Sequence, residues 1–137
     1  MINYALDTNA IIHYLHDEPN VLRNFRSAVM QGCKIVIPKM VDYEIQRGFC
    51  IKPNPRRENP YKVLLGNCAV IEINPNTWGY AIPIYAGHYQ RRHTADEMDI
   101  LIAALCLQND YTLVTNNVKD FQSVDGLKYV DWSLPTA

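Results

Sequence analysis

Short apolar runs alternate with longer helix-like stretches along this chain, and this alternation is the feature that most constrains its fold. The runs predicted as strands cover residues 2–6, 34–37, 69–73, 111–115 and, more briefly, 128–130. The stretches between them place apolar residues at helical spacing. Strands that alternate with helices are typical of a parallel sheet with right-handed crossovers. The sequence therefore predicts an α/β fold, with a central, mostly parallel sheet of four to five strands flanked by helices.

Capping residues and prolines set the predicted limits of the helices. Asn20 is an expected N-cap and Gly32 an expected stop, while residues 94–97 match a capping box. Pro83 should kink or interrupt its helix, and three prolines in residues 52–60 predict a loop. The predicted helices cover residues 8–15, 21–31, 41–49, 61–65, 77–92 and 100–107.

The composition narrows the class of protein. With 137 residues and 48% hydrophobic content, residues 1–137 are expected to form one domain with a real core. No apolar run approaches the roughly 18 residues of a membrane span, and no signal peptide is visible. The four cysteines are scattered without a paired spacing, which disfavours zinc and disulfides and favours a reducing cytoplasm.

The distribution of charge tells more about the substrate than the net charge of −1 does. Five cations fall between Arg47 and Lys62 against a single acid, Glu58, and Arg91 and Arg92 form a second basic spot. An anionic substrate would require such cations beside its site.

Four acids fall where a parallel sheet would bring them together. Asp7 follows the first predicted strand, Glu44 lies in the helix after the second, and Asp96 and Asp99 open the most apolar helix. Strand ends and helix starts meet at one edge of such a sheet. Carboxylates gathered there repel one another and usually hold a divalent cation.

Simpler roles exist for the same residues. Asp7 and Asp99 are well placed to stabilise helix N-termini. A phosphatase of the haloacid-dehalogenase type also carries an aspartate after its first strand, but it needs a second acid where Asn9 stands. No glycine-rich phosphate loop is present. His13 and His16 have a metal-binding spacing without an obvious third ligand.

Taken together, the motifs resemble those of a PIN-domain ribonuclease, and more narrowly a VapC-type toxin of bacterial toxin–antitoxin pairs. The resemblance spans residues 2–132 and rests on the segments 6–9, 44–48, 99–104 and 113–121, in that order. It implies a PIN-like three-layer sandwich.

The resemblance also assigns residues to the site. Asp7, Glu44 and Asp99 carry over as the catalytic acids that bind Mg²⁺ or Mn²⁺. Asn117 stands where the family usually has a fourth acid, so it is a candidate ligand, with Asp120 and Asp96 as alternatives. Groups that would orient carboxylates or water are Thr8, Asn9 and Thr115.

The function implied by the resemblance is that of a metal-dependent endoribonuclease toxin that cleaves RNA, with tRNA as the expected target. A cognate VapB-like antitoxin and a homodimer are implied as well. Arg47, Arg91 and Arg92 are expected to contact the RNA backbone. Two alternatives remain: a non-catalytic RNA-binding or assembly module that keeps the fold, which the neutral Asn117 favours, and a structure-specific DNA nuclease.

Overall fold

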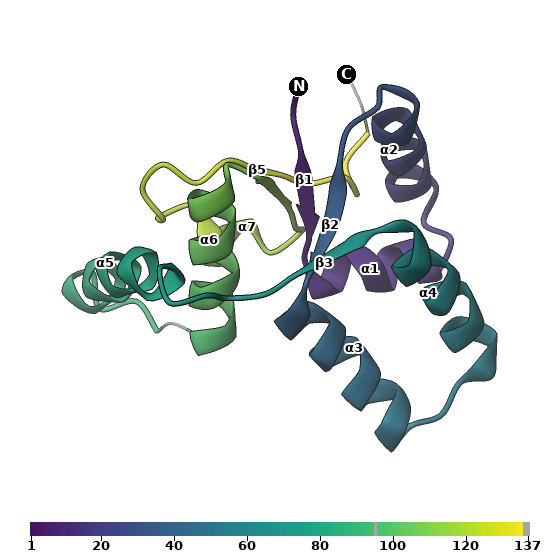
Figure 1. Cartoon of the computed structure of the whole chain (residues 1–137), viewed down its shortest axis with the longest axis horizontal. Coiled ribbons are helices and arrows are strands. Elements are labelled where there is room, and N and C mark those ends of the chain that lie inside the picture. The colour runs from purple at the N-terminus through teal and green to yellow at the C-terminus, as the bar shows by residue number, and fades with distance from the viewer. Residues whose placement is uncertain (95, 136–137) are drawn as a thin grey trace.

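Five short parallel strands form the centre of the computed structural model, which describes residues 1–94 and 96–135 (Figure 1). The strands are β1 (Tyr4–Leu6), β2 (Ile35–Pro38), β3 (Ala69–Ile71), β4 (Thr112–Val114) and β5 (Tyr129–Val130). They lie in the order β3-β2-β1-β4-β5, and every neighbouring pair is parallel. The predicted α/β class and parallel sheet are thus confirmed.

Helices lie on both sides of the sheet. They are α1 (Thr8–Leu15), α2 (Pro19–Met30), α3 (Lys39–Ile51), α4 (Pro55–Asn67), α5 (Thr77–Gln90), α6 (Glu97–Asn109) and α7 (Val118–Phe121). In Figure 1, α1 to α4 lie to the right of the strands, and α5 and α6 lie to the left. The central strands β1, β2 and β4 are buried between these two groups, with Val36, Ile37 and Leu113 fully enclosed, while the edge strands β3 and β5 are partly exposed. No helix in the described part of the chain is long and apolar enough to cross a membrane.

The order of the strands creates a switch point at the centre of the sheet. From β1 the chain moves outward to β2 and β3, and it then returns to the other side of β1 to form β4. Loops leave β1 and β4 in opposite directions at such a point, which opens a crevice at the carboxyl ends of the two strands. Ala5 pairs with Val36 on one side and with Leu113 on the other, so β1 is the strand that borders this crevice.

Two of the predicted helix starts are wrong. Asn20 does not cap α2: Glu18 is the N-cap residue and Pro19 takes the first turn, where a missing N–H costs nothing. Asn20 instead donates a hydrogen bond to the carbonyl of Ser133. Thr94 does not cap α6, because Asp96 does so by accepting from the N–H of Met98 at 2.8 Å. Ala95, inside the predicted capping box, lies outside the described residues.

Two prolines that were expected to break helices lie inside helices instead. The predicted loop 52–60 is wrong from Pro55 onward, because Pro55 occupies the first turn of α4 and the helix then continues through Pro60. Buried Tyr61 and Leu64 fix this helix to the core. Likewise α5 continues through Pro83, which removes one backbone hydrogen bond, while Ala81 and Ile84 bury the helix. Gly32, in contrast, ends its helix with φ +79°, as predicted.

Candidate active site

Asp7 is the fixed point of the candidate site. It follows β1 directly, and its N–H donates to the carbonyl of Val114 at the end of β4, at 2.9 Å. One carboxylate oxygen accepts from the N–H of Thr8 at 2.9 Å, which caps α1. The other accepts from the hydroxyl of Thr115 at 2.8 Å and the amide of Asn9 at 3.2 Å. Asp7 therefore caps a helix and also faces the crevice, so helix capping and metal binding are compatible roles for it.

Burial governs the ionisation of Asp7, whose side chain is only 4% exposed. Desolvation raises its pKa, and the hydrogen bonds from Thr115, Thr8 and Asn9 partly oppose that rise. The negative charge of Asp120 raises it further.

The end of β4 forms the opposite wall of the crevice. The hydroxyl of Thr115 accepts from the N–H of Asn117 at 2.9 Å, and Asn9 accepts from the N–H of Asn116 at 3.0 Å. These bonds tie the turn after β4 to the first turn of α1. Thr8, Asn9 and Thr115, expected to orient the site, are thus all brought to it, although the hydroxyl of Thr8 is buried without a hydrogen-bond partner among the described residues.

Glu44 reaches the crevice from the second turn of α3, the helix that follows β2. It is half-buried, and its pKa is raised by desolvation and then by the charge of Asp7. Arg47, one turn further along α3, lowers that pKa and lies with its guanidinium 5.0 Å from the centre of the Tyr43 ring. Arg47, one of the three arginines expected to contact RNA, therefore acts by its charge on an acid of the site.

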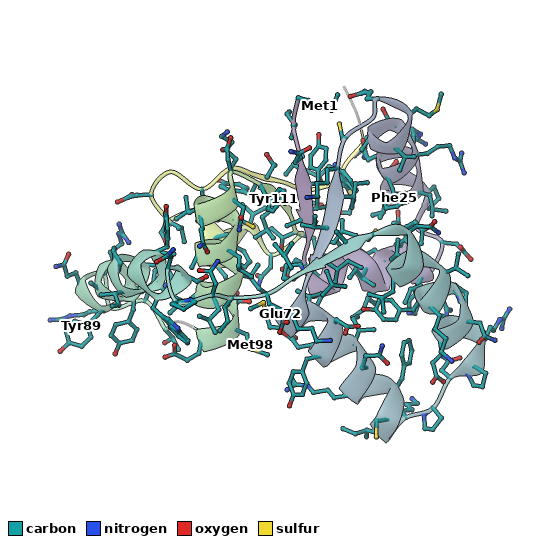
Figure 2. All side chains as sticks on the ribbon, viewed as in Figure 1. Met1, Phe25, Glu72, Tyr89, Met98 and Tyr111 are labelled. Atoms are coloured by element: carbon teal, nitrogen blue, oxygen red, sulfur yellow. The ribbon has the colours of Figure 1, made fainter. Side chains whose placement is uncertain are left out.

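Asp99, the third predicted catalytic acid, lies in the first turn of α6. Figure 2 places Met98, its neighbour, at the lower end of α6, where this helix begins. The N-cap role belongs to Asp96, so capping does not explain Asp99. Burial raises the pKa of Asp99 to about 7, together with the charges of Asp7, Asp96, Asp120 and Glu44. We call these five carboxylates the acidic cluster.

Asn117 lies beside Asp120, the member of the cluster that follows β4. The amide of Asn117 donates to one carboxylate oxygen of Asp120, and the other oxygen is 3.9 Å from Nε2 of His93. Because Asn117 uses its side-chain nitrogen for this hydrogen bond, its side-chain oxygen stays available as a neutral ligand. Asp120 is therefore held at the cluster through Asn117 rather than by the strand itself.

The chemistry of the cluster fits a hard divalent cation. Carboxylate, amide and hydroxyl oxygens are the donors that Mg²⁺ and Mn²⁺ prefer, and a cation would relieve the repulsion that raises the pKa of Asp99. Among residues 1–94 and 96–135, no three His, Cys, Asp or Glu side chains already converge closely enough to hold an ion. His13 and His16 gain no third ligand in this part of the chain either.

The two remaining arginines, Arg91 and Arg92, follow the last turn of α5. Arg91 lies 3.8 Å from the carboxylate of Asp125, and its guanidinium lies 2.9 Å from where a Cβ would stand on Gly87. Arg92 is exposed, with a left-handed φ of +54°. The sequence placed both arginines near Asp96, but it could not show which way the helix end turns.

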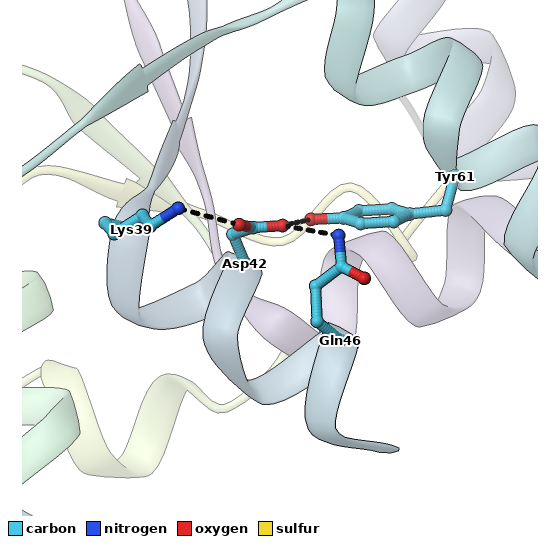
Figure 3. Close-up of polar contacts among 4 residues, drawn as sticks. All are labelled: Lys39, Asp42, Gln46 and Tyr61. Atoms are coloured by element: carbon cyan, nitrogen blue, oxygen red, sulfur yellow. Dashed lines mark hydrogen bonds and ion pairs between the residues drawn. The ribbon is translucent and has the colours of Figure 1, made fainter. Parts of the chain in front are cut away.

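Asp42 is a buried acid that the sequence analysis did not single out. Its carboxylate accepts from the hydroxyl of Tyr61 at 2.7 Å, from Gln46 at 3.3 Å, and pairs with Lys39 at 3.3 Å (Figure 3). Every contact joins α3 to itself or to α4, so Asp42 holds these two helices together. Its position two residues before Glu44 puts it on another face of α3, away from the acidic cluster.

Comparison with known proteins places these residues in context. A family profile described as PIN domain matches residues 4–127. Ribonuclease VapC2 of Rickettsia felis is 26% identical over 131 residues, which cover 94% of this chain and 97% of that protein. The structure of VapBC2 from Rickettsia felis, bound to a promoter DNA fragment, superposes with a TM-score of 0.85 at 25% identity, over 96% of this chain and 99% of that one. VapBC-1 from nontypeable Haemophilus influenzae gives a TM-score of 0.84 at 24% identity, over 98% and 100%.

Proposed function

The chain belongs to the PIN-domain family, and we propose that it is a metal-dependent endoribonuclease that acts as the toxin of a VapBC-type pair. The observation that carries the proposal is the acidic cluster at the switch point of the sheet. Asp7, Glu44 and Asp99 come from three separate elements, and each has a raised pKa. Such a strained arrangement of like charges is typical of a site that binds a cation. The name of the Rickettsia felis relative supports RNA as the substrate.

Asp7, Glu44 and Asp99 would hold Mg²⁺ or Mn²⁺, with Asn117 as a further ligand. The bound cation supplies a water of lowered pKa and stabilises charge on the scissile phosphate. Asp7 is kept in place by Thr115 and Asn9, which leave its carboxylate little freedom to turn. Asp99, with a pKa of about 7, can take or release a proton near neutral pH as the cation enters or leaves.

The basic residues around the site supply the contacts for an RNA backbone. Arg47 is exposed one turn from Glu44, and Arg92 is exposed before α6. Arg91 is within reach of Asp125, an exposed ion pair of little energetic weight that a phosphate can replace. A tRNA target is part of the proposal, since single-stranded loops are what proteins read best in RNA.

A VapB-like antitoxin and a homodimer are the proposed partners. The similar solved structures from Rickettsia felis and Haemophilus influenzae are named as VapBC assemblies. For the homodimer, α5 presents large apolar and aromatic side chains to solvent, among them Trp78, Ile82 and Tyr85. Exposed patches of this kind mark interaction surfaces. A cytoplasmic location stays a proposal that rests on the cysteines, all four of which are free.

The alternative is a non-catalytic RNA-binding or assembly module, and Asn117 favours it because a neutral amide replaces a ligand carboxylate. Cleavage separates the two. The purified chain, freed of any partner, would be incubated with total tRNA and Mg²⁺ or Mn²⁺, and the new ends would be mapped. We expect cleavage at discrete positions in the RNA, and EDTA should abolish it. A single-stranded DNA of matched sequence should not be cleaved. Binding of RNA without cutting under every metal condition would establish the alternative.

A further inference from the structure

A cleft of about 370 Å³ opens between α1 and α3 and continues from the acidic cluster. Thr8 and Glu44 belong both to the cleft and to the surroundings of the cluster. The start of α4 closes the far part of the cleft through Asn54 and Arg57. Any ligand in this cleft would therefore lie against the residues that we assign to phosphodiester cleavage.

The middle of the cleft is apolar. Ile12 and Leu15 from α1 face Ile45 and Phe49 from α3, and Phe49 is half-buried with its ring 6.2 Å from that of Tyr61. The volume is within the range of small-ligand pockets. A flat apolar group such as a nucleobase suits an apolar space that is bordered by an aromatic ring.

The cleft is cationic where α3 ends and α4 begins. Lys52 and Arg57 line it, and neither takes part in the ion pairs formed among the described residues. Arg57 donates one hydrogen bond to the carbonyl of Leu15 at the end of α1, which fixes the guanidinium in the wall of the cleft. Because a guanidinium has five N–H donors, most of them remain for an anion.

We propose, as an extension of the ribonuclease function proposed above, that this cleft receives one unstacked base beside the scissile bond of a single-stranded RNA. The base would occupy the apolar part against Phe49, and Lys52 and Arg57 would hold the adjoining phosphate. A nucleotide fits this cleft because it combines a flat, largely apolar base with a negatively charged phosphate, and the cleft combines an apolar part with two cations. A base still paired in a duplex cannot enter, so the cleft selects for single-stranded segments.

Gly48 provides a direct test, because it lines the cleft and a Cβ added there would meet nothing within 4 Å. Gly48→Leu should fill the cleft and leave the fold intact. Gly66→Leu is the matched control, since Gly66 is also a helical glycine with nothing within 4 Å of an added Cβ, and it does not line the cleft. Thermal melts of both variants should show no loss of stability, because glycine is a poor helix former.

The first measurement is binding in EDTA, where no cleavage occurs. A short oligouridine is compared with an abasic ribose-phosphate oligomer of equal length. We expect wild type and Gly66→Leu to prefer the oligouridine by about tenfold, the scale of one stacked base, and Gly48→Leu to lose this preference. Lys52→Gln should weaken both oligomers alike. The second measurement is kcat/KM for RNA cleavage with Mn²⁺, which should fall about tenfold in Gly48→Leu and stay unchanged in Gly66→Leu.

The outcomes separate the two proposals. If the chain cuts no RNA but Gly48→Leu removes the base preference, the cleft binds a base and the ribonuclease function is wrong. If RNA is cut and Gly48→Leu matches Gly66→Leu in both measurements, the base site is wrong and the ribonuclease function stands. Weakened binding of a protein partner by Gly48→Leu, with both RNA measurements unchanged, would assign the cleft to that partner and overturn our proposal.

Discussion

At the scale of single residues, Asp7 connects the fold to the chemistry. The same carboxylate caps α1, accepts from Thr115 across the crevice and contributes charge to the cluster. Such overlap explains why capping and metal binding could not be separated from the sequence. It also means that a test must remove the charge and keep the shape.

Asp7→Asn should abolish metal-dependent RNA cleavage, by at least about 100-fold, because a neutral amide is a poor ligand for a hard cation. The fold should persist, since the amide oxygen still accepts one hydrogen bond at the start of α1. Single-turnover cleavage under matched Mn²⁺ and a far-UV circular dichroism melt give the two readouts. Wild-type activity in this variant would remove Asp7 from the site.

Asp120→Ala should cost less, about tenfold or below, if Asn117 rather than Asp120 faces the cation. Asp120 is held by the Asn117 amide and lies near His93, and it contributes to the cluster through its charge. The comparison is the single-turnover rate at saturating Mn²⁺, with Asp7→Ala as the reference. Equal losses in the two variants would show that Asp120 is a ligand.

At the scale of elements, the sequence predicted the strands and the three acid-bearing elements well. Their signals are local: an apolar run, an acid after it, and the apolar α6, which begins after Asp96 and carries Asp99 in its first turn. The first half of α4 was missed because three prolines in residues 52–60 outweigh the helical signal there. What decides α4 is tertiary contact, above all Tyr61, whose partner Asp42 is 19 residues away. The missed helix contributes Arg57, so the cleft was missed with it.

Tyr61→Phe tests that contact between α3 and α4 (Figure 3). The hydroxyl of Tyr61 donates to buried Asp42, and burial together with this contact raises the pKa of Tyr61 far above its usual range. Removing the hydroxyl leaves a buried carboxylate short of one donor, so the free energy of unfolding should fall by about 1–3 kcal/mol. Chemical denaturation measures it. Tyr43→Phe, at an exposed tyrosine of α3, is the control and should change stability little.

At the scale of the whole molecule, the sheet order creates the site, and no local pattern reveals it. The crevice exists because β4 lies beside β1 rather than beyond β3. The sequence located the acids only because parallel sheets place strand ends at one edge. The direction of Arg91 and the contact between Asn117 and Asp120 depend on packing among the loops, which the sequence does not encode locally.

The stored repulsion of the acidic cluster should appear in the stability of the whole molecule. Asp99 has a pKa near 3.8 when unfolded and about 7 when folded. The folded state therefore binds more protons between these values, and metal-free stability should fall as the pH rises from 4 to 7. Half-burial and solvent screening reduce the effect to about 1–2 kcal/mol. Mg²⁺ or Mn²⁺, which binds only the folded state, should raise the melting temperature with its concentration.

Asp99→Asn should remove both effects. In EDTA at pH 8 the variant should melt at the same temperature as wild type or higher, because neutralising Asp99 relieves repulsion from Asp7 and its neighbours. It should also lose most of the metal-induced shift and the fall in stability between pH 4 and 7. A helix-stabilising role predicts the opposite sign, a loss of about 0.3–1 kcal/mol, but Asp96 already caps α6. Thermal melts across pH, with and without metal, decide the matter: a variant that melts lower in EDTA and keeps the full metal shift would place the cation elsewhere.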